Sequence, residues 1–222
     1  LILDHADTIQ TLIEAKRDLS KHLASKISLH LFFEASTRTQ FSFEIAAKKL
    51  GLTTLTPSIS NLSCLKGESL SDTINTFAAM GTNLFIIRHP DPLIFSQLTQ
   101  HLPQHTQIIN AGNGSYQHPT QALIDLYTIR QFKPNWSELT VSILGDVSHS
   151  RVANSLIQAL KALSVKETRI IAPELFMPED TDELKHIKRF TTVKTGLENA
   201  DVIFCLRIQK ERIRQSDLPN IQ

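Results

Sequence analysis

A short polar segment follows the first strongly apolar run of the chain, and it holds residue types that bind phosphate. Residues 36–39 read Ser-Thr-Arg-Thr and lie between an apolar run at residues 27–33 and a helical pattern at residues 39–50. The first turn of a helix presents unpaired N–H groups and the positive end of its dipole, so hydroxyls and a guanidinium placed there form an anion site. An ordinary capped helix with a surface arginine is the alternative interpretation of these residues alone. The residues predicted to form a phosphate pocket are Ser36, Thr37, Arg38 and Thr39.

The elements that must position this segment alternate along the chain between apolar strands and helices. Strands are expected at residues 27–33, 53–56, 84–88, 107–110, 140–144, 169–172, 191–193 and 202–206. Helices are expected at residues 4–20, 39–50, 69–79, 92–102, 119–132, 151–163, 181–187 and 197–200. This alternation predicts an α/β fold with parallel sheets covered by helices on both faces. A Lys-Pro-Asn-Trp-Ser segment at residues 133–137 looks like a junction, which predicts two doubly wound domains at residues 1–133 and 134–222.

In doubly wound folds, ligands bind beyond the carboxyl ends of the parallel strands. The candidate polar segments all lie at such ends, at residues 36–39, 88, 112–121, 145–151 and 207–209. We therefore expect loops of both domains to face a shared cleft that contains an active site.

Four further segments accompany the Ser-Thr-Arg-Thr segment in an order that a known family shares. Residues 33–44 resemble the carbamoyl-phosphate signature of the aspartate and ornithine carbamoyltransferases. The other four are Lys-Gly-Glu-Ser at 66–69, Arg-His-Pro at 88–90, His-Pro-Thr-Gln at 118–121 and Arg-Ile-Gln-Lys-Glu-Arg at 207–212. Five ordered matches over nearly the whole chain are far more specific than any one of them. The resemblance is to the aspartate branch of the family.

This resemblance implies transfer of the carbamoyl group of carbamoyl phosphate to the amine of L-aspartate. The products are N-carbamoyl-L-aspartate and phosphate, in an early step of de novo pyrimidine biosynthesis. Residues 1–133 would be the carbamoyl-phosphate-binding domain and residues 134–222 the aspartate-binding domain. The family's later His-Pro-Leu-Pro segment does not appear, so we expect the second domain to be incomplete at its C-terminal end.

The same resemblance assigns roles at the carbamoyl centre. The carbonyl oxygen becomes an oxyanion during the reaction, and fixed donors must stabilise it. The implied donors are Thr39, Arg88 and His118, while Gln121 would hold the carbamoyl amide. Direct attack of the aspartate amine, through a tetrahedral intermediate that expels phosphate, is the simplest mechanism. Positioning and charge stabilisation then supply the rate, and this chemistry requires neither a metal nor an organic cofactor.

Aspartate brings two carboxylates, and these call for forked guanidinium donors. Arg151 and Arg207 match aspartate-binding positions of the family, with Gln209 beside Arg207. Lys66 lies in a loop that, in the family, reaches into the neighbouring subunit's site. The resemblance therefore implies a homotrimer whose sites are shared between subunits. Whether regulatory chains or a dihydroorotase accompany it is left open by the sequence.

The chain departs from the family pattern at two positions. The family usually has a serine four residues before the lysine, where this chain has Leu62, with Ser63 adjacent. Either Ser63 supplies the hydroxyl or the contact is lost. Gln40 stands where the family commonly has a second arginine, and we expect a structural rather than a chemical consequence.

Two alternatives of different kinds accompany this interpretation. An ornithine carbamoyltransferase would share the fold and the phosphate signature, but it typically has cysteine in place of Thr120, and its cationic substrate favours acidic groups over arginines. A catalytically inactive paralogue acting as a binding subunit is supported only by Leu62, Gln40 and the short chain. A dinucleotide-binding enzyme is disfavoured because no strand leads into a G-x-G-x-x-G sequence.

The net charge, the lengths of the apolar runs and the two cysteines exclude some classes of protein. The formal net charge of +1 gives no electrostatic case for nucleic acid or an acidic membrane as partner. No apolar run approaches the ~18 residues of a membrane span. Cys64 and Cys205 form neither a metal-ligand spacing nor a disulfide framework, and two reduced thiols fit a cytoplasmic protein.

Overall fold

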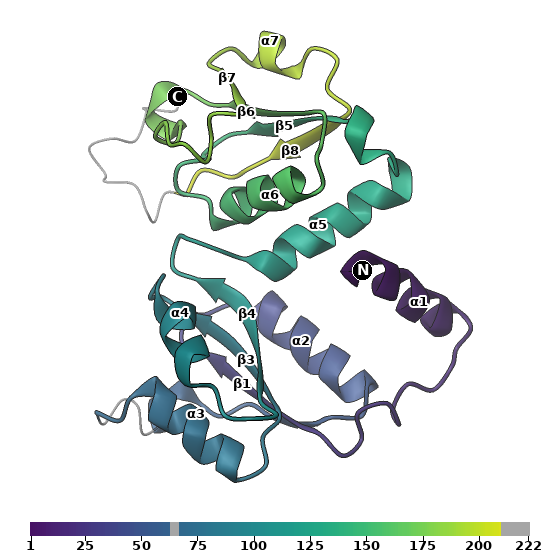
Figure 1. Ribbon diagram of the computed structural model, residues 1–222, viewed down its shortest axis with the longest axis vertical. Helices are drawn as coiled ribbons and strands as arrows, with labels where there is room; N and C mark the ends of the chain where they lie inside the picture. Colours follow the sequence, from purple (N-terminus) through teal and green to yellow (C-terminus); the bar gives the residue numbers. More distant parts are fainter. Residues whose placement is uncertain (63–66, 210–222) are drawn as a thin grey trace. The chain divides into compact units, whose positions relative to one another are not determined.

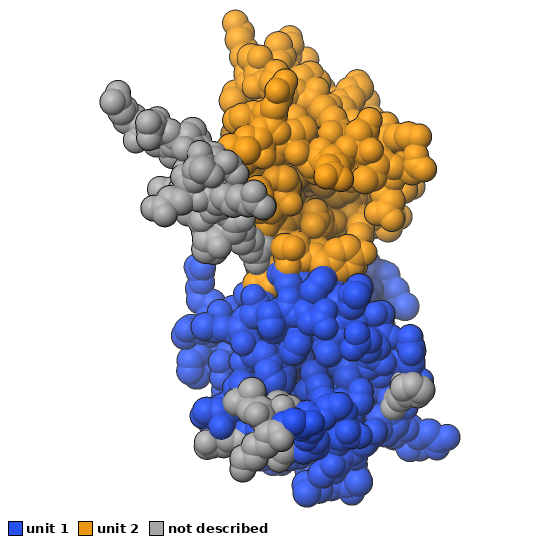
Figure 2. All heavy atoms as spheres, turned by 90° about the vertical axis from the view of Figure 1, so that its left-hand side faces the viewer, with its two compact units in different colours: residues 1–114 blue, residues 115–222 orange. Residues whose placement is uncertain are grey.

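The computed structural model describes residues 1–62 and 67–209 of the 222-residue chain. The chain divides into two compact units, residues 1–114 and residues 115–222, shown in blue and orange in Figure 2. Each unit contains its own parallel sheet and its own helices (Figure 1). The predicted arrangement of two α/β domains with parallel sheets is therefore confirmed.

The first unit is built on a four-stranded parallel sheet in the order β2-β1-β3-β4. The strands are β1 (Ile27–Phe32), β2 (Thr53–Leu55), β3 (Leu84–His89) and β4 (Gln107–Asn113). The helices are α1 (Ile2–Glu14), α2 (Thr37–Lys49), α3 (Leu70–Ala79) and α4 (Ile94–Leu98), with the 3₁₀ turns η1 (Ile59–Asn61) and η3 (Thr99–His101).

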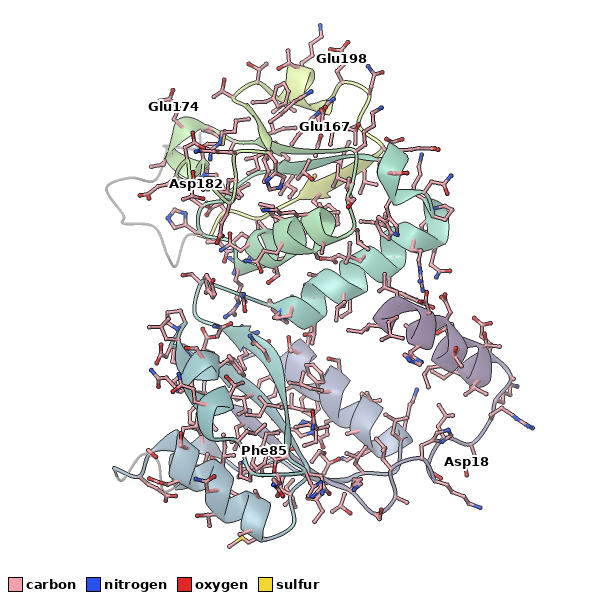
Figure 3. The ribbon with its side chains drawn as sticks, viewed as in Figure 1. Asp18, Phe85, Glu167, Glu174, Asp182 and Glu198 are labelled. Atoms are coloured by element: carbon pink, nitrogen blue, oxygen red, sulfur yellow. The ribbon has the colours of Figure 1, made fainter. Side chains whose placement is uncertain are left out.

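The core of this unit lies on both faces of the sheet, because β1 and β3 carry apolar side chains on both sides. On one face Leu29, Leu31 and Phe85 pack against α3 and α4. Phe85, labelled in Figure 3, is fully buried. On the other face Phe32 and Ile86 pack against residues that include Phe43 of α2. Helices thus cover both faces, as continuous apolar strands require.

The second unit has a four-stranded parallel sheet in the order β7-β6-β5-β8. The strands are β5 (Thr140–Leu144), β6 (Glu167–Ile171), β7 (Lys188–Phe190) and β8 (Val202–Cys205). The helices are α5 (Pro119–Phe132), α6 (Arg151–Ala162) and α7 (Val193–Leu197), with the 3₁₀ turns η4 (Trp136–Glu138) and η5 (Glu174–Phe176).

Helices α6 and α7 cover opposite faces of this second sheet (Figure 1). The buried face of α6 includes Leu156 and Leu160, and α5 packs against the same helix. On the α7 side, Arg169 of β6 pairs with Glu167 and also donates to the Glu198 carbonyl, both labelled in Figure 3. The second unit is therefore a sheet between two helical layers.

The two units divide earlier in the chain than the junction predicted at residues 133–137. In this division α5 lies with the second unit, where it contacts α6. No helix among the described residues is long and apolar enough to cross a membrane.

Candidate active site

Both sheets reverse their strand order beside the segments that the sequence singled out. In the first unit the chain runs outward from β1 to β2 and then continues on the other side at β3. In the second unit it runs outward from β5 through β6 to β7 and returns at β8. Crevices at such reversals, beyond the carboxyl ends of the strands, are where open α/β sheets bind ligands. The predicted phosphate segment follows β1, and the two predicted aspartate segments follow β5 and β8.

The phosphate segment forms the N-terminus of α2. Ser36 is the N-cap residue, but its hydroxyl makes no capping bond to the backbone. It donates instead to the Thr39 hydroxyl over 2.9 Å. The Ser36 side chain therefore leaves the first-turn amides of a thirteen-residue helix to other acceptors, while the Arg38 side chain is exposed. This arrangement suits an anion.

Arg88 lies next to this segment at the same edge of the sheet. Phe32 at the end of β1 pairs in register with Arg88, and the Phe33 N–H donates to the Arg88 carbonyl over 2.8 Å. The guanidinium is largely buried, with Nη1 3.4 Å from the Ala111 carbonyl oxygen and Nε 3.6 Å from the Glu34 carboxylate. These contacts fix the arginine in place beside the phosphate segment.

The end of β4 and the glycine that follows it contact the segment that comes after Arg88 in the chain. Asn113 is buried, accepts a hydrogen bond from Asn110 over 2.9 Å and donates to the Pro92 carbonyl over 2.6 Å. Gly114 has a φ of +49°, and a Cβ there would lie 2.7 Å from the Pro90 carbonyl oxygen. A side chain at this position would therefore push the loop away from the Arg-His-Pro segment.

In the second unit, the His-Pro-Thr-Gln segment begins α5. His118 is buried, and Pro119 occupies the first turn, where its missing N–H costs nothing. The His118 N–H donates to the Ser155 hydroxyl of α6 over 2.8 Å. Ser155 lies one turn after Arg151 on α6, so this bond brings the start of α5 to the helix that Arg151 opens.

Gln121 lies on the first turn of α5 and is oriented by a neighbour one turn later. Its Nε2 donates to the Asp125 carboxylate over 3.0 Å. Burial raises the pKa of Asp125, and the bond from Gln121 opposes that rise. With its nitrogen turned toward Asp125, Gln121 keeps its oxygen as an acceptor, which is the group that a carbamoyl NH₂ requires.

The two predicted aspartate segments are joined through Asp146, which is completely buried. Its Oδ1 accepts from the His149 ring Nδ1 over 2.7 Å, and its Oδ2 accepts from the Gln209 backbone N–H over 2.9 Å. Gly145 permits this approach, because a Cβ there would lie 2.6 Å from the Leu206 carbonyl oxygen. Arg207 lies in the joined segment and is exposed.

The grouping of Asp146, Ser148 and His149 is not a nucleophilic triad. The Ser148 hydroxyl lies 3.0 Å from Nδ1 of His149, the same nitrogen that the Asp146 carboxylate contacts. In a nucleophilic triad, the hydroxyl and the carboxylate contact opposite ring nitrogens. This geometry agrees with a direct transfer that needs no covalent intermediate on the protein.

Around Lys66, the structure describes Leu62 on one side and Gly67, Glu68 and Ser69 on the other. Lys66 and Ser63 lie outside the described residues. Leu62 packs in the apolar cluster of the first unit and is 6% exposed. It therefore serves the core at the position where the family usually has a serine.

Sequence reasoning missed the residues that support the site. These residues are Asp146, His149 and Ser155. Their contacts depend on tertiary placement and side-chain orientation, which no spacing rule predicts. The only available signal for Asp146 was its place after a buried strand and a glycine. Among the described residues, no group of three or more His, Cys, Asp or Glu side chains is arranged to hold a metal ion.

Comparison with known proteins identifies the family. Residues 1–131 match the family model described as "Aspartate/ornithine carbamoyltransferase, carbamoyl-P binding domain". The chain belongs to the aspartate/ornithine carbamoyltransferase family. The matched region contains the phosphate segment, Arg88 and the His-Pro-Thr-Gln segment of this chain, and it ends close to the predicted junction.

Relatives of this chain are named for aspartate. Over 197 residues the chain is 47% identical to the aspartate carbamoyltransferase catalytic subunit of Coxiella burnetii strain CbuK_Q154, covering 89% of the chain and 63% of the relative. It is also similar to the crystal structure of aspartate transcarbamoylase from Trypanosoma cruzi in complex with carbamoyl aspartate and phosphate, with a TM-score of 0.85 and 31% identity. That match covers 97% of the chain and 69% of the crystallised one. The chain thus spans less than two thirds of the length of the curated relative.

Proposed function

We propose that this protein transfers the carbamoyl group of carbamoyl phosphate to L-aspartate, yielding N-carbamoyl-L-aspartate and phosphate. The observation that carries the proposal is the position of the ligand segments at the strand-order reversals of both sheets. At the reversal in the first sheet, the N-terminus of α2, which is suited to an anion, lies beside the buried Arg88. At the reversal in the second sheet, the Asp146 carboxylate bonds to both segments that contain a predicted aspartate-binding arginine. The titles of the similar crystal structures name carbamoyl phosphate, aspartate and carbamoyl aspartate as ligands of those proteins.

In the proposed reaction, carbamoyl phosphate is held by its phosphate group and polarised at its carbonyl. The hydroxyls, first-turn amides and guanidinium of residues 36–39 hold the phosphate. Thr39, Arg88 and His118 stabilise the oxyanion, and the Gln121 oxygen accepts from the carbamoyl NH₂. The neutral amine of aspartate attacks the carbonyl carbon, the tetrahedral intermediate collapses, and phosphate leaves with the proton from the amine.

The aspartate carboxylates are assigned to Arg151, Arg207 and Gln209, with Lys66 completing the site. We further propose that residues 1–133 act as the carbamoyl-phosphate-binding domain and residues 134–222 as the aspartate-binding domain. The family model that ends at residue 131 supports this boundary. In this proposal the enzyme acts in the cytoplasm, early in pyrimidine biosynthesis.

A direct assay tests the activity. The purified natural protein is supplied with carbamoyl phosphate and either L-aspartate or L-ornithine, and carbamoyl-aspartate and citrulline are quantified. We expect carbamoyl-aspartate only. Citrulline formation would assign the chain to the ornithine branch, and phosphate binding without either product would favour an inactive binding subunit.

The homotrimer with shared sites is proposed on the family resemblance of the Lys66 loop. Lys66→Ala and Arg38→Ala proteins should each be inactive. Mixing and reassociating them should restore part of the activity, because a mixed trimer contains a site with both native residues. Subunit exchange demonstrated by mass spectrometry without recovery of activity would show that Lys66 acts within its own chain or not at all.

A further inference from the structure

One buried carboxylate receives donors from both arginine-bearing segments of the second unit. Asp146 has no exposed surface. Its Oδ1 accepts from the Nδ1 and the backbone N–H of His149, at 2.7 and 3.3 Å, and from the Ser148 hydroxyl at 3.4 Å. Its Oδ2 accepts from the Gln209 N–H at 2.9 Å. Three donors thus come from the loop after β5 and one from the segment after β8.

The His149 ring makes the shortest of these contacts. Because the carboxylate can only accept, Nδ1 of the ring must carry the proton that it donates. A charge-assisted bond of this length is stronger than a bond between neutral groups. The ring is 31% exposed while the carboxylate is completely buried, so the imidazole is the outer of the two groups.

A buried carboxylate must find donors, because leaving a charge uncompensated in the interior is costly. Asp146 shares its two oxygens between His149 and Gln209. If the ring donor is lost, the carboxylate must turn toward other donors or admit water. Either change shifts the oxygen that holds the Gln209 backbone, and Arg207 lies only two residues away.

We propose that His149 is a positioning residue for the dicarboxylate substrate, an inference that rests on the proposed function. By holding the Asp146 carboxylate, His149 fixes the Gln209 backbone and thereby places the Arg207 guanidinium for its forked contact. His149 itself does not touch the substrate in this assignment. Its effect reaches the aspartate step and leaves carbamoyl-phosphate binding unchanged.

Three substitutions in the natural protein test this role. His149→Asn places an amide nitrogen near the position of Nδ1, so it keeps the donor. His149→Gln moves that nitrogen one methylene outward, and His149→Ala removes it. Steady-state kinetics with each substrate varied should show an aspartate KM about tenfold higher in His149→Ala and His149→Gln than in the wild type, because each variant loses one such hydrogen bond. Asn should remain within about threefold of the wild type.

The KM for carbamoyl phosphate should stay unchanged in all three variants. His186→Ala, an exposed histidine of the same unit, is the matched control and should leave both constants unaltered. If His149→Ala does not fold, the aspartate KM values of His149→Asn and His149→Gln still test the proposal. The proposal would be overturned by an unchanged aspartate KM in His149→Gln or by equal impairment of His149→Asn and His149→Gln. An equal rise in the KM for aspartate and the KM for carbamoyl phosphate would also overturn it. Absence of carbamoyl-aspartate formation by the wild type would instead refute the proposed function.

Discussion

The backbone N–H of His118 donates to the hydroxyl of Ser155 over 2.8 Å, although the two residues are 37 positions apart. Ser155 is buried on α6, one turn after Arg151. The bond therefore joins a residue assigned to the carbamoyl carbonyl with the helix that begins at a residue assigned to aspartate. Ser155 is not among the residues assigned to either proposed substrate, so its substitution reports on the placement of His118.

Ser155→Ala should lower both stability and turnover. The His118 N–H would remain buried without its acceptor, at a cost of about 1–3 kcal/mol in the free energy of unfolding. The start of α5 would also loosen, and kcat should fall because His118 is no longer held in place. Urea unfolding and steady-state kinetics measure the two effects. Ser137→Ala, in an exposed turn of the same unit, is the control, and an equal effect of both substitutions would remove the special role of Ser155.

Arg38→Ala should abolish phosphate binding while the protein stays folded. Arg38 is exposed in the first turn of α2, so its removal leaves no cavity. Losing a charge-assisted contact to the anion should reduce the rate by roughly 10²-fold or more. Lys49→Ala, at the opposite end of the same helix, should retain activity. Isothermal titration with carbamoyl phosphate checks both variants, and normal affinity in folded Arg38→Ala protein would refute the phosphate pocket.

Arg207→Lys should sharply raise the aspartate concentration required for half-maximal rate. An ammonium cannot make the forked contact that a guanidinium makes with a carboxylate. Succinate keeps both carboxylates and lacks the amine, so it should compete with aspartate in the wild type and more weakly in the variant. The inhibition constant of succinate, determined in each protein with aspartate as the varied substrate, measures this competition. Competition by ornithine and not by succinate would contradict the assignment of this segment.

The fold could be predicted from the sequence because the central strands are short, largely apolar segments that alternate with helical patterns. The helix predicted at residues 181–187 was wrong, since the structure has turns there and a strand at Lys188–Phe190. That strand is set by its register with β6 and by Arg189, whose Nη1 donates to the Pro178 carbonyl. Local periodicity contains no information on such tertiary contacts.

The candidate site, like the fold, could be predicted from local sequence patterns but not in its tertiary contacts. Segments with unusual polar residues at strand ends could be recognised, since carboxyl ends of parallel strands meet at one edge. The contacts that hold them could not, because Asp146 and Gln209 are 63 residues apart and Asp146 alone resembles any loop carboxylate. The role of Leu62 likewise became clear only from its packing in the core.

Acidification should destabilise the first unit through His30. This residue lies on β1, is 1% exposed, and bonds through Nε2 to the Ser28 hydroxyl at 3.2 Å, while Nδ1 is buried without a hydrogen-bond partner. Burial lowers the pKa of His30; Glu44 of α2 opposes this and Lys48 adds to it. The unfolded chain therefore binds a proton at a higher pH than the folded protein does.

The stability that His30 contributes is consequently present above the unfolded pKa of about 6.5 and is lost as pH falls toward the lower folded pKa. One group contributes a slope of at most about 1.4 kcal/mol per pH unit. Urea unfolding between pH 7.5 and 5 should show this slope in the wild type and a shallower one in His30→Asn, which keeps a polar group on β1. His105→Asn, at an exposed histidine whose φ of 63° suits asparagine, should keep the wild-type slope. His89 also has a pKa lowered mainly by burial, so some slope should persist in His30→Asn. Identical slopes in wild type and His30→Asn would show that His30 does not couple protonation to unfolding.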